Sequence, residues 1–402
     1  MAKLNTVADG NFYWLTQNYN VYANSQDNPL GEPIAGSIRK DWLDKLGLPI
    51  PKTLDEFYNA LLAFQTKDVN GNGLKDEVVR PINGIGGGIA QWFGLANSPI
   101  VAPLDGKATS PWYQNHVQDY FAFLNKLYKA GLLELGETND SILIENRAAY
   151  YLAYMADTFT PPIVVTPPGA PKVYYIPIVI QAYPDTKPRV TNEGGVTQWL
   201  GSGMYAVPAK SKNVQKAAQF IDYLFTKEYR DMNEYGILGY TYNVDSNGVV
   251  KRINTNNDNV GVDQPLYWQT LPALYSGWQG IFPRMKNYDI VPGKKNEMVG
   301  LGQSMGYPNG YIEAYEMIEK FWNKTWDTIP TPDGVLAFPT NAESDRMNEI
   351  LPDLQTYIAE LSTALIMGTK SLSGWNGYIA DMKRLGLDEY VTIYQARLDR
   401  AK

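Results

Sequence analysis

The chain has 402 residues, enough for two domains and a large hydrophobic core. It contains no cysteine, which excludes disulfides, thiolate metal sites, cysteine nucleophiles and a lipid-anchoring cysteine within this sequence. The net charge is −7 and no basic run stands out, so nucleic acid is not expected as a partner. No apolar stretch is long enough to cross a membrane, and the first residues lack the apolar segment of a signal peptide.

Aromatic residues are unusually frequent: 29 tyrosines, 10 tryptophans and 12 phenylalanines make up 13% of the chain. Tyrosine and tryptophan combine a flat apolar face with a hydrogen-bonding edge, which matches the faces and hydroxyl rims of sugar rings. A tyrosine-rich core would give the same composition, so the excess favours carbohydrate only modestly. The single histidine, His116, is expected at the surface or in packing, because few partner residues for a catalytic or metal site accompany it.

The first part of the chain is predicted to mix extended segments with helices. Residues 1–36 are expected to be irregular or extended, and the glycine-rich residues 84–88 to form a flexible turn, since they lack the spacing of a phosphate-binding loop. Thr53 is expected to cap a helix, with Glu56 completing a capping box. Helices are predicted over residues 38–46, 54–66 and 112–130.

The middle of the chain is predicted to alternate strands with helices. Residues 141–155 are expected to run from helix to strand, and the proline-rich residues 160–172 to form a surface loop. Further strands are predicted over 173–180 and 204–208, helices over 214–225 and 229–235, and a hairpin with an Asn-Gly turn over 243–250.

Helical patterns dominate from about residue 263 onward. Helices are predicted over residues 265–275, 309–327, 343–367, 372–385 and 388–400. Pro352 should start a new helix or kink the long one. Because strands alternate with helices early and helices dominate late, the predicted fold class is α/β with a helix-rich C-terminal part.

The segment from residue 68 to residue 77 carries side-chain oxygens at every second position, with glycines between them. Alternate side chains of a tight loop can converge on one point, and Gly73 would allow the sharp turn. Oxygen-only ligands at this spacing suit Ca²⁺. We therefore predict a shortened, EF-hand-like structural calcium loop with the Leu74 carbonyl as an extra ligand. The side-chain ligands would be Asp68, Asn70, Asn72, Asp76 and Glu77.

A second interpretation of this loop stays open. The full EF-hand pattern places its closing glutamate later, where this chain has Val79. A polar Asn-Gly turn without a metal would use similar residues. Five oxygen side chains in ten residues exceed what a turn needs, which favours calcium. Because free calcium is scarce in the cytosol, such a site would also indicate a location outside the cytoplasm.

Several motifs follow one another along the chain in a recognisable order: residues 38–49, 51–57, 68–77, 203–212, 217–225, 233–239, 366–372 and 385–390. Together they resemble the extracellular solute-binding proteins, family 1, of bacterial ABC transporters. They look like the carbohydrate-binding group of this family, whose members are often Gram-positive lipoproteins. Each motif alone is modest, and the set covers essentially the whole chain.

The resemblance implies a two-lobe, periplasmic-binding-protein-like fold of type II, with a saccharide held between lobes that hinge segments join. It implies a non-catalytic, monomeric oligosaccharide-binding protein at the cell surface that delivers its ligand to a transmembrane ABC permease. It also implies a calcium ion on the loop, away from the sugar. The expected division is 1–155 for part of the N-terminal lobe, 156–310 for mainly the C-terminal lobe with hinge crossings, and 311–402 for helices packing across lobes and hinge.

The beginning of the chain departs from the family pattern. Family members usually start with a signal peptide, a lipobox cysteine and a long further segment of the first lobe. Here residues 9–14 resemble a motif from the middle of that lobe. The first lobe is therefore expected to be incomplete, and a truncated or split receptor that does not bind sugar alone is the alternative function.

A sugar cleft needs aromatic stacking faces and a few polar anchors. Tryptophans flanked by glycine, proline or loop signals are the preferred candidates, because they fall outside helical stripes; Tyr154 and Asp157, at a predicted strand end, add a ring and a carboxylate. The candidate ligand-binding residues are Trp14, Trp92, Tyr154, Asp157, Trp199, Trp268 and Trp278. Ordinary packing is at least an equal alternative for each. Candidates to pair with a uronate carboxylate are Arg39, Arg80, Arg189 and Arg284.

A glycoside-processing enzyme is the remaining functional class. It would need two carboxylates at a defined separation. Among 42 acidic residues such a pair can always be nominated, so the signal carries no weight and no enzyme is predicted.

Overall fold

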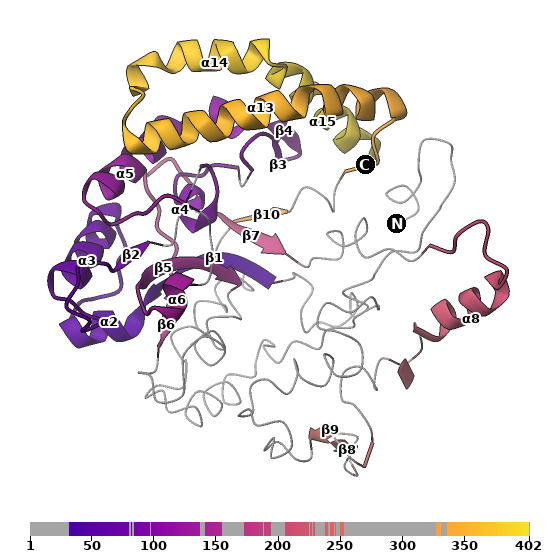
Figure 1. Ribbon diagram of the computed structural model, residues 1–402, viewed down its shortest axis with the longest axis horizontal. Coiled ribbons are helices and arrows are strands. Elements are labelled where there is room, and N and C mark those ends of the chain that lie inside the picture. The colour runs from indigo at the N-terminus through magenta and orange to yellow at the C-terminus, as the bar shows by residue number, and fades with distance from the viewer. Residues whose placement is uncertain are drawn as a thin grey trace.

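The computed structural model describes a first block over residues 32–154 with short gaps, a second block over residues 336–401, and several shorter segments between them. They are residues 32–79, 84–96, 98–136, 141–154, 173–187, 189–193, 206–224, 242–244, 250–252, 327–330 and 336–401, with residues 82, 226, 228–229, 238–239 and 246. Within these ranges a central β-sheet is flanked by helices, and the C-terminal helices lie together along one side (Figure 1). The predicted α/β class with a helix-rich C-terminal part is confirmed.

Strand β1 (Glu32–Arg39) is the centre of a six-stranded sheet. Strand β5 (Ala148–Tyr154) pairs antiparallel along one edge of β1, with Ile34 opposite Tyr154. The other edge of β1 is shared by β6 (Tyr175–Pro177) and β7 (Arg189–Glu193), both antiparallel. The sheet is thus organised around β1, which pairs with three other strands.

Two short strands extend the sheet in parallel. Strand β2 (Val78–Val79) pairs with β5, and β10 (Asp327–Pro330) pairs with β7. Strands β1, β7 and β10 therefore lie side by side although they come from widely separated parts of the sequence. Of the strands in this sheet, β5 was anticipated at the end of residues 141–155 and β6 as part of a longer strand over residues 173–180.

The first two helices largely match the sequence patterns. Helix α2 (Lys40–Leu46) begins two residues later than predicted, because the backbone remains extended through the end of β1. Helix α3 (Leu54–Thr66) is capped by Thr53, whose hydroxyl accepts from the amide of Glu56 at 3.1 Å. The returning bond of Glu56 goes to the amide of Lys52, at 2.7 Å, one residue before the cap.

The glycine-rich segment does not form the predicted flexible turn, because it enters helix α4 (Gly87–Trp92). The reason is a close approach between this helix and the sheet. A Cβ added to Gly88 would lie 2.8 Å from the Cα of Gly36 in β1, and nearer still to the hydroxyl of Tyr150 in β5. Only glycine fits this approach.

The predicted helix over residues 112–130 is divided. A hairpin of β3 (Ala102–Leu104) and β4 (Lys107–Thr109) leads into a 3-10 turn, η1 (Pro111–Tyr113). Helix α5 (Val117–Lys129) begins only after His116, whose left-handed backbone, with φ of 64°, interrupts the helix.

Several shorter elements complete the described part. Helix α6 (Ser141–Ile144) precedes β5, as predicted, and α8 (Val214–Leu224) confirms the described part of the helix predicted over 214–225. Strands β8 (Tyr242–Val244) and β9 (Val250–Arg252) confirm the predicted hairpin. The predicted helices at 265–275 and 309–327 lie outside the described residues, apart from Asp327, which begins β10. Most of the predicted helix at 229–235 and part of the strand at 204–208 do so too.

The C-terminal part consists of α13 (Asn341–Met367), η5 (Leu372–Gly374), α14 (Trp375–Arg384) and α15 (Leu387–Ala401). A capping box between Thr340 and Glu343 starts α13. The helix continues through Pro352, so the expected new start is wrong. Burial of Ile350 and Leu354 on either side of the proline offsets its cost of about 3 kcal/mol.

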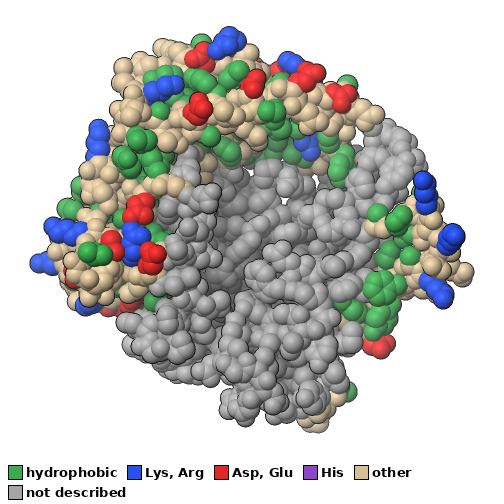
Figure 2. All heavy atoms as spheres, in the orientation of Figure 1, with side chains coloured by type: hydrophobic (Ala, Val, Ile, Leu, Met, Phe, Trp, Pro, Cys, Tyr) green, Lys and Arg blue, Asp and Glu red, His purple; other side chains and the backbone are tan. Residues whose placement is uncertain are grey.

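One hydrophobic cluster joins α2–α5 and the sheet to α13–α15. Long-range hydrogen bonds reinforce it: the Asn125 amide donates to the carbonyl of Ile366 at 2.7 Å, and Gln395 accepts from the amide of Ala108 at 2.8 Å. Acidic and basic side chains are interspersed over the outer face of the C-terminal helices (Figure 2). Among the described helices, none combines the length and the apolar character that a membrane crossing requires.

Candidate functional site

The predicted calcium loop connects α3 to β2 and folds through left-handed backbone at three positions. These are Asp68, Gly71 and Gly73, with φ of 46°, 78° and 81°. Lys45 of α2 anchors the loop by donating to the carbonyl of Val69 at 2.7 Å. The turns bring the side chains at both ends of the loop to one side of it.

Asp68 organises the first half of the loop. Its Oδ1 accepts from the amide of Asn72 at 3.0 Å, and its Oδ2 accepts from the amide of Gly73 at 3.0 Å. The Oδ1 of Asn70 accepts from the amide of Asn72 at 3.1 Å, and the Oδ1 of Asn72 accepts from the amide of Leu74 at 2.8 Å. The loop is thus held by side-chain to main-chain bonds that position its oxygens.

Asp76 gathers the second half. Its carboxylate accepts from the side-chain amides of Asn70 at 3.1 Å and Asn72 at 3.0 Å. Arg147, at the start of the β5 region, contributes an ion pair at 3.1 Å. The structure therefore brings Asn70, Asn72 and Asp76 together, as the sequence predicts.

Glu77 is the least satisfied member of the loop. The residue is 0% exposed; its Oε1 accepts from the amide of Asn70 at 3.1 Å, whereas its Oε2 is buried with no hydrogen-bond partner in the described ranges. Burial raises the pKa of this carboxyl, and the negative charges of Asp76 and Asp68 raise it further. A buried carboxylate oxygen without a donor is what a cation would satisfy.

The remaining predicted ligand, Leu74, lies at the loop tip with its side chain 60% exposed. No three His, Cys, Asp or Glu side chains of the described residues are grouped so that they alone could hold a metal ion. A hard cation in this loop would therefore depend on the asparagine oxygens and a main-chain carbonyl as well as the carboxylates, which is the mixed oxygen set that Ca²⁺ accepts.

The structure places two of the predicted saccharide ligands. Trp92 is 1% exposed, and its ring packs edge-on against Phe57 and Tyr150, at centroid distances of 4.9 and 5.5 Å. This burial leaves no open face on Trp92 and counts against a stacking role. Tyr154 ends β5 at the central sheet. The other predicted ligands lie outside the described residues: Trp14, Asp157, Trp199, Trp268 and Trp278.

Arg39 is not available to a uronate, contrary to its candidacy. It is 1% exposed and forms a bidentate pair with Asp41, at 2.8 and 2.7 Å. It also donates to the Oδ1 of Asn146 at 2.6 Å, and its guanidinium lies 3.9 Å from the ring centroid of Trp42. The carbonyl of Asn146 in turn accepts from the Asn70 amide at 3.3 Å, so this buried cation connects the loop to the sheet. Arg80 and Arg284 lie outside the described residues.

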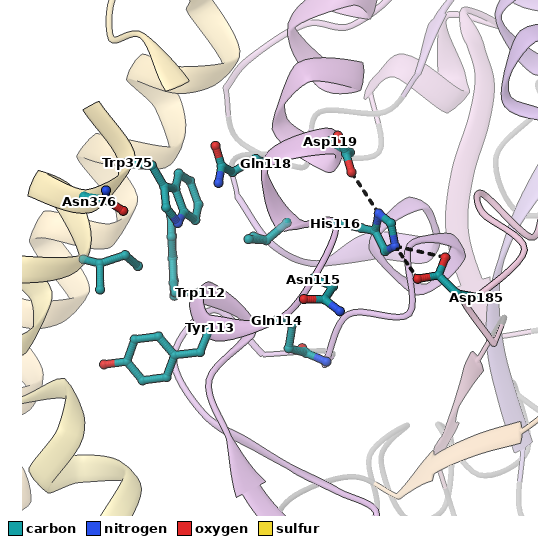
Figure 3. Close-up of a pocket in the computed structure, with 12 residues that line it drawn as sticks. Trp112, Tyr113, Gln114, Asn115, His116, Gln118, Asp119, Asp185, Trp375 and Asn376 are labelled. Atoms are coloured by element: carbon teal, nitrogen blue, oxygen red, sulfur yellow. Dashed lines mark hydrogen bonds and ion pairs between the residues drawn. The ribbon is translucent and has the colours of Figure 1, made fainter. Parts of the chain in front are cut away.

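Sequence reasoning did not anticipate a polar pocket of about 710 Å³ between η1, the start of α5 and α14 (Figure 3). At one side Trp112 stacks on Trp375, with centroids 5.6 Å apart. The Tyr113 hydroxyl donates to Asp388 at 2.6 Å, and Gln114 accepts from a main-chain amide at 2.7 Å. Much of this wall is engaged in internal contacts. His116 lies on the opposite side between two carboxylates.

A family model of bacterial extracellular solute-binding proteins matches residues 5–231. The chain belongs to this family. The predicted family is confirmed, and with it the class of a solute-binding protein rather than an enzyme. The family also supports an extracellular location.

Two relatives are similar to this chain, one over about half of it and the other over most of it. The lipoprotein LipO of Bacillus subtilis is 27% identical over 248 residues, which are 55% of this chain and 46% of LipO. FusA of Streptococcus pneumoniae, a fructooligosaccharide ABC transporter substrate-binding protein, is 22% identical over 382 residues, which are 90% of this chain and 65% of FusA. The chain thus spans less than two thirds of the length of each.

Solved structures confirm the two-lobe solute-binding fold. FusA in complex with kestose has a TM-score of 0.68 and 19% identity, covering 99% of this chain and 78% of that one. An EF-hand mutant of FusA in complex with fructo-nystose has a TM-score of 0.67 at the same identity and coverage. The alginate-binding protein AlgQ2 without calcium ion has a TM-score of 0.66 and 21% identity, covering 99% of this chain and 76% of AlgQ2.

Proposed function

We propose that this chain binds an oligosaccharide, without altering it chemically, for delivery to an ABC transporter. The observation that carries the proposal is the alignment of FusA, a fructooligosaccharide-binding protein, with 90% of this chain. The likeness of the fold to FusA in complex with kestose supports it. Closure of two lobes around the sugar would shift an open–closed equilibrium through contacts made in the closed form.

The proposed partners and location follow the same relatives. The saccharide would be passed to a transmembrane permease, which a monomeric, extracytoplasmic receptor can approach by diffusion. Similarity to the lipoprotein LipO supports a lipid-anchored member of the family.

Saccharide binding is tested by tryptophan fluorescence of the purified protein in calcium buffer. Kestose is the neutral probe and an oligogalacturonate is the acidic one. We expect a saturable change with one class, and no new reducing ends on prolonged incubation. Alanine substitution of Tyr154, Trp199 or Trp278 should weaken binding about fivefold or more, because stacking and burial of an aromatic ring on a sugar contribute about 1 kcal/mol or more.

A matched control is Trp42→Phe, since Trp42 of α2 is 3% exposed and packs edge-on against Phe64 of α3. It should leave affinity unchanged. A cooperatively folded protein that responds to neither saccharide class would contradict the proposal. Release of reducing ends would instead indicate a glycoside-processing enzyme.

We further propose that the loop from residue 68 to residue 77 holds a structural Ca²⁺. The residues present fit the ion: all donors are oxygens, three are carboxylates, and the buried Oε2 of Glu77 has no hydrogen-bond partner in the described ranges. One solved structure of FusA is of an EF-hand mutant, so this relative carries an EF-hand, which supports the proposal. The holding groups would be the side chains of Asp68, Asn70, Asn72, Asp76 and Glu77 and the carbonyl of Leu74.

A bound Ca²⁺ supplies positive charge and no bond-making chemistry. The asparagine amides, which now donate to Asp76, would rotate to present their oxygens, and the carboxylates of Asp76 and Glu77 would lose their mutual repulsion. The proposed role is therefore stability of the α3–β2 connection rather than contact with the sugar.

Calcium binding is tested by thermal unfolding of chelator-treated protein with increasing Ca²⁺. At 100-fold excess over the dissociation constant we expect about 2.7 kcal/mol of added stability. Asp68→Asn should remove most of this gain, because Asp68 holds the first half of the loop. The charge-matched control Asp345→Asn, on the exposed side of α13, should retain it. A wild-type protein indifferent to Ca²⁺ would favour the plain polar turn.

A further inference from the structure

The only histidine of the chain lies between two carboxylates from different elements (Figure 3). The Nδ1 of His116 is 2.9 Å from an oxygen of Asp119 in α5. Its Nε2 is 3.0 Å from an oxygen of Asp185, in the turn over residues 183–186. The imidazole also stacks on Tyr183 of that turn, with ring centroids 4.2 Å apart and planes 12° apart.

This geometry selects the protonation state of the ring. A neutral imidazole has one N–H donor and one lone pair, so it can satisfy only one of the two carboxylates. The doubly protonated imidazolium donates from both nitrogens and carries the charge that two acidic neighbours favour. The charged groups that face it are Asp119 and Asp185, and Tyr183 is the neutral titratable group beneath it.

The backbone at His116 adopts a conformation that few residues other than glycine adopt. Its φ of 64° is unusual for a residue other than glycine, although histidine, asparagine and aspartate tolerate it best. This conformation interrupts the helical pattern and sets the ring at the start of α5, where it faces the turn. The side chain is 19% exposed, so protons reach it from solvent.

The turn that His116 contacts leads directly into the sheet. The amide of Thr186 donates to the carbonyl of Tyr183 at 3.0 Å, and the amide of Ala182 donates to the carbonyl of Trp92 at 3.0 Å. Three residues beyond Thr186 the chain enters β7, which pairs with β1 on one side and β10 on the other. Holding the turn therefore holds the approach to the strand that joins three distant parts of the sequence.

We propose that His116 is a pH-operated clamp that fastens the 183–186 turn, and with it the approach to β7, to the start of α5. The clamp is closed while the imidazole carries its second proton and opens when that proton is lost. Its operation does not depend on saccharide binding or on calcium.

The direction of the pH effect follows from the surroundings. Burial lowers the pKa of His116, but hydrogen bonds to Asp185 and Asp119 and their charges outweigh burial and raise it. The hydrogen bond from His116 lowers the pKa of Asp185. The clamp is therefore closed from mildly acidic pH up to about 6.5, the ordinary histidine value, and is lost as pH rises through the raised pKa of His116.

Proton NMR of the full chain tests the clamp, because a single histidine gives one assignable imidazole titration. We expect a midpoint above 6.5, which Asp185→Asn and Asp119→Asn each lower. Asp353→Asn, an equal charge change on α13, should leave the midpoint in place. A wild-type midpoint at or below 6.5, or one that neither aspartate variant moves, would overturn the proposal.

Hydrogen exchange separates a clamp from an incidental ion pair. The amides of Ala182 and Thr186 should exchange about two- to fivefold faster above the His116 midpoint, after correction for intrinsic exchange, as expected for partly exposed charge pairs. His116→Asn keeps a residue that tolerates the left-handed backbone, and should give the faster exchange at every pH. If the pH response survives in His116→Asn, the clamp is not the cause.

Discussion

The loop at residues 68–77 and the cluster around His116 both crowd carboxylates, and they differ in where the compensating charge comes from. In the cluster, the imidazole of His116 lies between two aspartates, and a second proton on the ring would supply a cation within the cluster. In the loop, the carboxylate of Asp76 pairs with Arg147, which also pairs with Glu134 and Glu145. The carboxylates around His116 can be neutralised by a side chain of the same cluster. Those of the loop share Arg147 with two other glutamates, so a bound metal cation would suit them better.

The largest expected effect concerns a third arrangement, the buried cation Arg39. Arg39→Met removes the hydrogen-bond donor to Asp41 and to Asn146. We expect a loss of about 2 kcal/mol of unfolding free energy in urea denaturation, because these two partly buried acceptors lose a charged donor. Arg346→Met, which removes an exposed arginine paired with Glu389, is the control and should change little. Equal effects of the two variants would mean that burial does not strengthen dependence on an internal cation.

A smaller effect on stability, whose sign depends on calcium, is expected for the loop at residues 68–77. In chelator-treated protein, Glu77→Gln removes a buried charge near Asp76 and Asp68, so we expect it to stabilise the fold by about 1 kcal/mol. In saturating Ca²⁺ the same variant should be the less stable protein, because a ligand is lost. Paired thermal melts with and without calcium measure both signs. The same sign in both conditions would contradict an external cation at this loop.

The smallest expected effects are the pH slopes of stability. The raised pKa of Glu77 means that the folded state binds protons more readily than the unfolded state, so without metal the unfolding free energy should fall as pH rises through that pKa. Calcium should reverse this slope, since it binds the carboxylate. His116 gives a second fall at higher pH that calcium leaves unchanged. Urea melts of Glu77→Gln and His116→Asn assign each slope; a calcium-sensitive His116 slope would show that the two clusters are coupled.

The sequence predicted local features well, because they depend on neighbouring residues. Thr53 caps α3, and the side chains of Asn70, Asn72 and Asp76 meet within the loop, since turns at Gly71 and Gly73 bring them together. Their role as ligands of a cation stays a prediction. The predicted family was confirmed because its motifs are spread along the chain.

Features that depend on distant partners were not predictable in this way. Trp92 has the flanking glycine of a loop residue, yet the close approach of Gly88 to Gly36 docks its helix on the sheet and buries the ring. Nothing near Arg39 in the sequence indicates that it is buried. Its contact with Asn146, just before β5, comes from a residue 107 positions away. The pairing of His116 with Asp185 spans 69 residues, and no local pattern encodes it.

The order in which this core can be completed follows from its long-range pairings. Strand β7 acquires its second neighbour only when residues 327–330 are available, and α5 and β4 are covered by segments 241 and 287 residues further along the chain. Contacts of such separation make folding slow, because the chain must close large loops before they contribute. During synthesis, the first block therefore waits with part of its apolar surface uncovered until the final helices emerge.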